Sequence, residues 1–268
     1  MASLMQNVKQ LVLVLVILTL SGCDLQNDML YYPSSYVPGQ NELAARHIQF
    51  WPGGVGEYRG FISTIPVSNV KGTIVVFHGN AGTAADREYY MNDLPALGYR
   101  IILAEYPGYG ARKGKLGEVS FVNDAKETMR IAFEQYGKPL YLLGESLGCG
   151  VAASLAKETP VPIDGIILIT PWNTLLAVAK EKFPWLPVKL FLRDKYDSNQ
   201  NLKAFRGRIT VIGAERDDII PIHHAKALYE SLPGQKKMWV IKGAGHNDWL
   251  DLMDRSKWKE ITDFVRGE

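Results

Sequence analysis

The chain has 268 residues, of which 47% are hydrophobic and 22% charged, and its formal net charge is +2. This composition is ordinary for one globular α/β domain, and the length is sufficient to bury a sizeable core. The near-neutral charge and the absence of long Lys/Arg runs exclude a nucleic-acid-binding surface of the usual basic kind, so no nucleic-acid partner is expected.

The first 22 residues contain an apolar run that a cysteine follows closely. Lys9 precedes LVLVLVILTL, an apolar run of about ten residues, whereas a bilayer-spanning helix needs roughly 20, so the run has the length of the apolar part of a signal peptide. The following LSGC resembles the lipobox of bacterial lipoproteins, so we expect residues 1–22 to be a signal peptide and Cys23 to be lipidated through its thiol. The alternative is an uncleaved N-terminal anchor, and either arrangement holds the chain at a membrane of the bacterial cell envelope. Asp24 resembles an inner-membrane retention signal.

The residues that follow divide into a tether and alternating strands and helices. Residues 23–41 are aperiodic and carry several Pro and Tyr residues, which indicates a tether across the domain surface. His47–Trp51 and Tyr58–Ser63 favour a hairpin. Buried strands are predicted at GTIVVFHG, YRIILAEY, LYLLG, GIILIT, RITVIGA and KMWVIKGA, and helices at 84–97, 118–135, 147–157, 222–231 and 248–265. This order predicts a mostly parallel sheet with helices on both faces, which binds ligands beyond the carboxyl ends of its strands.

One connection is too long and too apolar for an ordinary loop. GIILIT and RITVIGA are separated by roughly 38 residues, whereas loops in α/β units usually have about 2–6. The sequence FPWLPVKLFL within it would be unusual in a solvated loop. We therefore interpret residues 171–206 as a small helical cap over the site. An ordinary connecting helix with a long approach is the alternative.

The segment Gly144–Gly148 (GESLG) matches the pattern G-x-S-x-G between a predicted strand and a predicted helix. The glycines suit a turn so sharp that side chains at the flanking positions would clash. This turn strains the backbone of the serine and exposes its hydroxyl, so Ser146 is the candidate nucleophile. Cys149 is a second possible nucleophile in the same segment, but a cysteine one turn into the helix is expected to pack as a buried hydrophobic residue.

A serine nucleophile requires a base and a carboxylate that orients the base. Of the five histidines, His246 alone follows the last predicted strand. GAERDDIIP, after the strand RITVI, offers Asp217 and Asp218 as acids. The order serine, acid, histidine is the order found in α/β-hydrolases.

The motifs FHGNAG, EYPGYG, GESLG, TPWNTL, DKYDS, GAERDDIIP and GAGHND follow one another over most of residues 77–249. Together they resemble an α/β-hydrolase fold serine hydrolase, and within that superfamily the small-capped, membrane-associated members related to prolyl-oligopeptidase and bud-emergence-type hydrolases. The resemblance implies an α/β-hydrolase domain over residues 42–268. It also implies a Ser146–Asp217–His246 triad, because the family's acid stands four residues before the proline of D-x-x-[VI]-P. Asp218 is the lesser candidate.

The same resemblance implies an oxyanion hole and a substrate pocket. Leu147 would supply one backbone N–H, and the loop HGNAG would supply the other from Asn80 or Ala81, with Asn80 preferred. We expect His78 to orient this loop rather than to transfer protons. Candidate pocket residues are Ala81, Tyr109, Trp172 and Trp185, with core packing as the alternative for Tyr109 and Trp172.

No cofactor and no metal ion are expected. His223 and His224 are adjacent in a predicted helix, where we expect their side chains to point in different directions, and no second ligand pair has suitable spacing. Glu145 is expected to reach a nearby loop. Asp248 is expected to cap the last helix.

These features predict a membrane-tethered serine hydrolase that cleaves a carboxylic ester, thioester or amide through an acyl-enzyme. The apolar cap and the lipid anchor favour a small-molecule acyl substrate of lipid origin. A dedicated oligopeptidase is disfavoured, because no acidic selector or second substrate domain is visible. The alternatives are a non-catalytic lipoprotein scaffold with this fold and an acyltransferase. The substrate and the oligomeric state are left open.

The lipoprotein hypothesis is testable at Cys23. A Cys23→Ser variant should lose incorporation of a radiolabelled fatty acid and should accumulate as the uncleaved precursor, because the acylated thiol is the feature that the lipobox resemblance implies. Gel mobility and lipid labelling of the expressed full chain provide the measurement. Normal processing of the variant would contradict the hypothesis.

Overall fold

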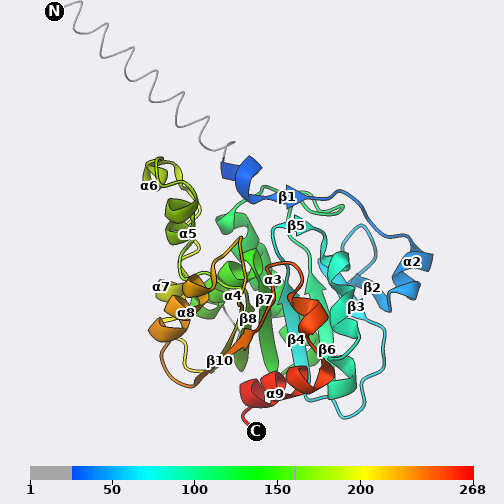
Figure 1. Cartoon of the computed structure of the whole chain (residues 1–268). Helices are drawn as coiled ribbons and strands as arrows, with labels where there is room; N and C mark the ends of the chain where they lie inside the picture. Colours follow the sequence, from blue (N-terminus) through cyan, green and yellow to red (C-terminus); the bar gives the residue numbers. More distant parts are fainter. Residues whose placement is uncertain (1–25, 160) are drawn as a thin grey trace, which may run out of the picture.

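The computed structural model describes residues 26–159 and 161–268 of the chain (Figure 1). The predicted signal peptide (residues 1–22) lies outside the described residues, as do Cys23 and Asp24. Among the residues that are described, no helix has both the length and the apolar character needed to cross a membrane.

The centre of the described structure is an eight-stranded sheet with the order β10–β9–β8–β7–β4–β6–β3–β2. The pairs β2–β3 and β3–β6 are antiparallel, and the remaining pairs are parallel. The prediction of a mostly parallel sheet is therefore confirmed. The strands are β2 (Ile48–Trp51), β3 (Gly60–Ser63), β4 (Gly72–Phe77), β6 (Tyr99–Ala104), β7 (Leu140–Glu145), β8 (Gly165–Ile169), β9 (Arg208–Ala214) and β10 (Lys236–Ile241).

Helices cover both faces of this sheet, because the central strands are apolar on both sides. In β7, Leu142 packs into one core with α3 and α4, whereas Leu143 packs into the opposite core with η1 and α9. The α-helices are α2 (Gln40–Ala45), α3 (Glu118–Tyr136), α4 (Leu147–Glu158), α5 (Leu175–Lys182), α6 (Val188–Phe191), α7 (Ser198–Leu202), α8 (Ile222–Ser231) and α9 (Arg255–Arg266). The 3-10 helices are η1 (Ala84–Met91), η2 (Pro95–Leu97) and η3 (Trp249–Leu252).

Two predicted helices differ from the structure. Residues 84–97 form two 3-10 helices, η1 and η2, which are separated by residues 92–94. Within η1 the backbone is itself non-helical at Arg87 (φ −105°, ψ 17°). The last helix begins at Arg255 rather than at Asp248. Asp254 is in the extended conformation and its side chain accepts a hydrogen bond from the N–H of Lys257 at 2.9 Å, so it caps α9.

The segment between β8 and β9 contains α5, α6 and α7. An isolated antiparallel bridge between Thr174 and Asp197 joins the two ends of the part that carries α5 and α6. Each of these bridge residues also caps a helix, since Thr174 accepts from the N–H of Ala177 and Asp197 from that of Gln200. α7 packs against α4, so α5 and α6 alone extend beyond the helical layer (Figure 1). The domain boundaries stay a prediction.

The segment predicted as an aperiodic tether is partly regular and partly buried. Residues 26–30 are helical, and β1 (Tyr32–Pro33) pairs in parallel with β5 (Ala81–Gly82). The reason is the buried carboxylate of Asp194, which accepts hydrogen bonds from Gln26 Nε2 at 2.7 Å and Tyr31 Oη at 2.6 Å. Because a buried carboxylate needs donors, this contact fixes the segment beside the cap. In Figure 1 the blue N-terminal turn accordingly lies at the same end of the molecule as α5 and α6.

The close approach of α4 to β4 provides a test of the packing. A Cβ on Gly148 would lie 1.9 Å from the carbonyl oxygen of Phe77 and 2.9 Å from that of His78. Backbone atoms cannot rotate away, so Gly148→Ala should lower the free energy of unfolding by about 2–3 kcal/mol, measured by urea denaturation. Gly56→Ala is the control, because no atom of the described residues lies within 4 Å of a Cβ there. Equal stabilities of the two variants would contradict the packing described.

Candidate active site

Ser146 lies in a strained turn between β7 and α4. Its φ is +52° and its ψ −114°, a conformation that non-glycine residues rarely adopt. A Cβ on Gly144 would lie 2.6 Å from the carbonyl oxygen of Gly148, so the two ends of the turn approach too closely for side chains. The N–H of Ser146 donates to the carbonyl of Ile169 at 2.9 Å, which ties the turn to the end of β8.

The structure brings together the three residues of the predicted triad. The Oγ of Ser146 lies 3.0 Å from Nε2 of His246. The Nδ1 of the same imidazole lies 2.7 Å from Oδ2 of Asp217. All three residues are buried, with 7–9% of their surface exposed. They come from the carboxyl ends of β7, β9 and β10, which the parallel sheet places along one edge.

Backbone hydrogen bonds fix the acid in its orientation. Oδ1 of Asp217 accepts from the N–H groups of Ile219 at 3.0 Å and Ile220 at 2.7 Å, which leaves Oδ2 directed at the imidazole. The acid loop is joined to the histidine loop, because the N–H of Arg216 donates to the carbonyl of Ala244 at 2.7 Å. The relative position of acid and base is therefore set by the backbone.

Asp248 has a different role from the one predicted. Its carboxylate accepts from the N–H of Gly245 at 2.5 Å, and it does not cap α9, which begins seven residues further along the chain. The physical reason is that residues 249–252 form the 3-10 helix η3 and Met253 is extended, so the α-helix restarts after Asp254. Asp248 thus closes the loop that carries His246.

The loop after β4 lies beside Ser146 and is held by several hydrogen bonds. Nδ1 of His78 donates to the carbonyl of Gly79 at 2.7 Å, while Nε2 lies 3.0 Å from the buried carboxylate of Glu105. In a planar trans peptide the next N–H points opposite to that carbonyl, so the N–H of Asn80 points away from the imidazole of His78. A Cβ on Gly79 would lie 3.7 Å from Cβ of Ser146, which places this peptide next to the hydroxyl.

The two predicted oxyanion donors border the same cavity. Asn80 and Leu147 both line it together with Ser146. The N–H of Leu147 belongs to the first residue of α4, so it has no acceptor within the helix. The carbonyl of Asn80 accepts from the N–H of Tyr32 at 2.9 Å and from Tyr109 Oη at 2.7 Å. These contacts fix the backbone around Asn80, and its role as a donor stays a prediction.

Glu145 supports the turn from the other face of the sheet. Its carboxylate accepts from Arg87 Nε at 3.1 Å, from Tyr90 Oη at 3.1 Å and from Tyr89 Oη. Burial raises the pKa of both tyrosines, so their hydroxyls stay protonated and donate. The residue before the nucleophile is therefore anchored to η1.

An apolar cavity of about 270 Å³ opens at Ser146. Its walls come from the N-terminal segment, from α5 and α6, and from the residues that follow Asp217. The apolar lining residues are Met29, Leu30, Leu147, Trp172, Leu175, Val178, Ala179, Phe183, Leu186, Val188, Phe191, Leu192, Ile219 and Ile220, and the polar ones are Gln26, Asn80, Ser146 and Lys182. A hydroxyl at the end of such a cavity suits chemistry on a molecule with a long apolar part.

Of the predicted pocket residues, Trp172 lines this cavity and the other three do not. Trp185 is 78% exposed, because the turn from Phe183 to Leu186 directs those two side chains to the cavity and leaves the tryptophan outside. Tyr109 is fully buried and its hydroxyl donates to the loop carbonyl of residue 80. Ala81 lies in β5, which pairs with β1.

Cys149 is a packing residue in the structure. It is fully buried, and its single S–H is shared between the carbonyls of Gly144 at 3.1 Å and Ile169 at 3.2 Å. Burial raises the pKa of its thiol well above the usual value. A buried neutral thiol is a poor nucleophile, which leaves Ser146 as the group with a base beside it.

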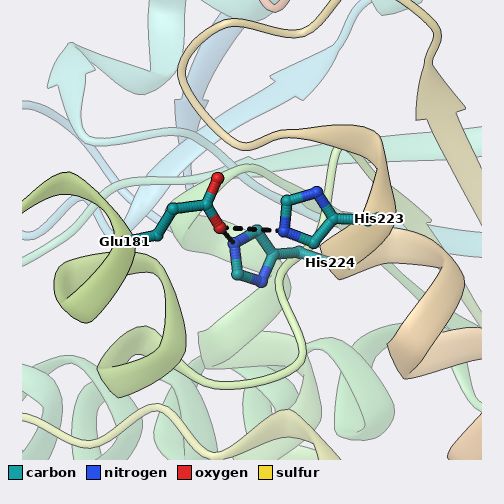
Figure 2. A group of neighbouring side chains, drawn as sticks. All are labelled: Glu181, His223 and His224. Atoms are coloured by element: carbon teal, nitrogen blue, oxygen red, sulfur yellow. Dashed lines mark hydrogen bonds and ion pairs between the residues drawn. The ribbon is translucent and has the colours of Figure 1, made fainter. Parts of the chain in front are cut away.

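His223 and His224 do not point in different directions, contrary to the prediction. Their rings lie 4.3 Å apart, and Nε2 of each faces the same carboxylate oxygen of Glu181, at 2.8 and 3.0 Å (Figure 2). Both side chains can reach the same carboxylate because they occupy the first turn of α8, next to Glu181 of α5. Burial lowers the pKa of His224.

Two features of the site were missed in the sequence. The cavity is lined in part by Gln26, Met29 and Leu30. This segment is held in place by hydrogen bonds to Asp194, which is distant in the sequence. Glu181 lies 42 residues before His223 in the chain. The adjacent histidines were a usable signal, but nothing local marks their carboxylate partner.

Comparisons with known proteins agree with this architecture. A family described as serine aminopeptidase, S33 matches residues 68–193. The uncharacterized protein Rv2307c of Mycobacterium tuberculosis is 31% identical over 184 residues, which cover 68% of this chain and 64% of that protein. The lysophosphatidylserine lipase ABHD12 of Danio rerio is 28% identical over 207 residues, which cover 68% of this chain and 53% of that protein. The chain thus spans less than two thirds of the length of these relatives.

Solved structures show the same fold. The esterase Pf2001 of Pyrococcus furiosus superposes with a TM-score of 0.63 at 18% sequence identity, covering 88% of this chain and 97% of the esterase. The structure therefore has the α/β-hydrolase fold, as the motifs around Ser146 and His246 predicted.

The choice between the two acids can be tested by the reactivity of Ser146 toward a fluorophosphonate probe. Asp217→Asn should slow labelling by on the order of 10⁴-fold, as in other triads, because the amide favours the wrong imidazole tautomer. Asp218→Asn should label near the wild-type rate, since this side chain is exposed. The reverse order of the two variants would move the acid by one residue.

Proposed function

We propose that this chain is a membrane-tethered serine hydrolase that cleaves a carboxylic ester, thioester or amide through an acyl-enzyme. The observation that carries the proposal is the Ser146–His246–Asp217 arrangement, with 3.0 and 2.7 Å between its members, at the end of an apolar cavity. The likeness to a family of serine aminopeptidases and to a lipase supports hydrolytic chemistry.

In the proposed mechanism His246 is the general base. Its Nδ1 faces the carboxylate of Asp217 and therefore carries the hydrogen, so Nε2 has the lone pair that accepts the proton of Ser146. The serine oxygen attacks the acyl carbon, and the N–H groups of Leu147 and Asn80 stabilise the oxyanion. His246 then protonates the leaving group, and a water molecule activated by the same base releases the acid.

The cavity favours an acyl chain as the group on the carbonyl carbon. In the described lining the only charged side chain is that of Lys182, and it donates to the backbone carbonyl of Asp218. An aminopeptidase needs an acidic group to receive the substrate's ammonium, and no Asp or Glu lies among the described lining residues. A lipid-derived ester is therefore preferred over a peptide, in keeping with the likeness to a lysophosphatidylserine lipase.

The lipid anchor is part of the proposal. Cys23 lies three residues before Gln26, and Gln26 lines the cavity. An acylated Cys23 would hold this wall near the surface of the membrane, where lipid-derived esters are found. The bacterial cell envelope is the proposed location, with the inner membrane favoured by Asp24.

The test combines a variant with a series of substrates. Ser146→Ala should abolish both fluorophosphonate labelling and hydrolysis of p-nitrophenyl esters, while Ser35→Ala, at an exposed serine, should retain both. For the wild type, kcat/KM should rise by up to about fourfold for each added methylene until the cavity is full, since each buried CH₂ contributes about 0.8 kcal/mol.

Three outcomes would argue for the alternatives. A wild-type chain that forms no covalent adduct at Ser146 would favour a non-catalytic scaffold. Transfer of the acyl group to an added alcohol in preference to water would favour an acyltransferase. A strong preference for aminoacyl amides over acyl esters would favour a peptidase.

A further inference from the structure

We propose that Glu181, His223 and His224 form a binding site for a divalent transition-metal ion of the Zn²⁺ type, which joins α5 to α8. The site is separate from the triad, and the proposal does not depend on the proposed hydrolase activity. It rests on the arrangement of three ligand atoms, on the hydrogen bond that orients His224, and on the position of the two helices.

The three side chains converge from two helices (Figure 2). Oε2 of Glu181 lies 2.8 Å from Nε2 of His223 and 3.0 Å from Nε2 of His224, and all three ligand atoms lie within 4.8 Å of one another. Zn²⁺ binds such atoms at about 2.0–2.2 Å, which separates neighbouring ligands by roughly 3.3 Å in a tetrahedral site. The two separations between carboxylate and imidazole therefore lie within about half an ångström of this value, and the exposed side chains of Glu181 and His223 can adjust to admit the ion.

A hydrogen bond fixes the imidazole of His224 in a metal-binding orientation. Oδ1 of Asn173 accepts from the N–H of Thr174 at 2.9 Å, which identifies this atom as the oxygen. The same oxygen lies 3.0 Å from Nδ1 of His224, so Nδ1 carries the hydrogen. In the neutral ring Nε2 then presents a lone pair to the carboxylate. Metal-ligating histidines usually have such a partner on the second nitrogen.

Two acceptors that face each other across 3.0 Å require a cation between them. A second proton on His224 would meet this requirement, and so would a metal ion. The metal ion is favoured because Nε2 of His223 faces the same oxygen, so that three ligands rather than two meet at one point. Two imidazoles and one carboxylate suit Zn²⁺ and its neighbours, whereas Mg²⁺ and Ca²⁺ prefer oxygen ligands alone.

The site is accessible and has an open position. The side chain of His223 is 59% exposed and that of Glu181 is 42% exposed, while that of His224 is 4% exposed. An ion can therefore enter from solvent and retain water as a fourth ligand. The buried histidine supplies a fixed ligand, and the two exposed groups adjust around the ion.

The metal would connect two walls of the cavity. Val178 and Lys182 of α5 line one wall, and Ile219 and Ile220, which precede α8, line another. Ile219 and Ile220 also donate their N–H groups to the acid of the triad. Binding of the ion should therefore restrain the cap helix relative to the loop that holds Asp217.

The test is Zn²⁺ binding by the full chain, prepared without a polyhistidine tag and depleted of metal with a chelator. In competition with a chromophoric chelator, the wild type should bind one Zn²⁺ that is weakened at least tenfold by His223→Ala and by Glu181→Gln. Neither variant removes a buried group, so both should fold. His47→Ala is the matched control, since it removes an exposed histidine elsewhere and should leave the affinity unchanged.

A second measurement separates this site from the triad. Zn²⁺ should raise the Tm of the wild type and of His246→Ala, and should leave the Tm of His223→Ala unchanged, because a ligand that binds the native state stabilises it. Equal affinities of the wild type and His223→Ala would overturn the proposal. Binding that disappears only in His246→Ala would also overturn it, by assigning the ion to the triad.

Discussion

The site depends on one close contact between backbones, where α4 meets the end of β4. Gly148 lies against the carbonyl of Phe77 with no room for a Cβ, and Gly144 lies against Gly148. This contact sharpens the turn between β7 and α4 and forces Ser146 into its positive φ. Because β4 and β7 are adjacent and parallel, the same contact places the loop after β4 beside the serine. A change that separates α4 from β4 would displace both together.

The other parts of the site are oriented by backbone hydrogen bonds. One oxygen of Asp217 is occupied by two N–H groups, so only the other is available to His246. The loop of His246 is closed by Asp248. A site prepared in this way needs little reorganisation when charge develops during a reaction. The sheet fixes the positions of the strand ends, and the short loops that follow them hold the side chains of the triad in fixed orientations.

The sequence was informative where a feature depends on local pattern. Six apolar runs marked the strands, and the glycines around Ser146 marked the turn, because both features arise from neighbouring residues. Prediction failed where the direction of a side chain or its partner is determined by residues distant in the sequence. Trp185 lies in an apolar segment, which favoured a place in the pocket, but its side chain is exposed to solvent. The residues around Gln26 line the cavity because Asp194 is buried beside them, and that contact joins residues 168 positions apart.

Apolar packing and polar contacts both hold the cap, and the polar contacts at its margins define its orientation. The apolar lining of the cavity favours closure but specifies no direction, because hydrophobic contact is non-directional. Directional contacts occur at the two sides, where Asp194 binds the N-terminal segment and Glu181 binds the histidines of α8. Asp194 is buried, so its hydrogen bonds lie in surroundings of low dielectric, whereas Glu181 is exposed and its contact is screened by solvent. The two margins thus differ in solvent exposure, and the side of the cap next to the N-terminal segment is held by the contact that solvent screens less.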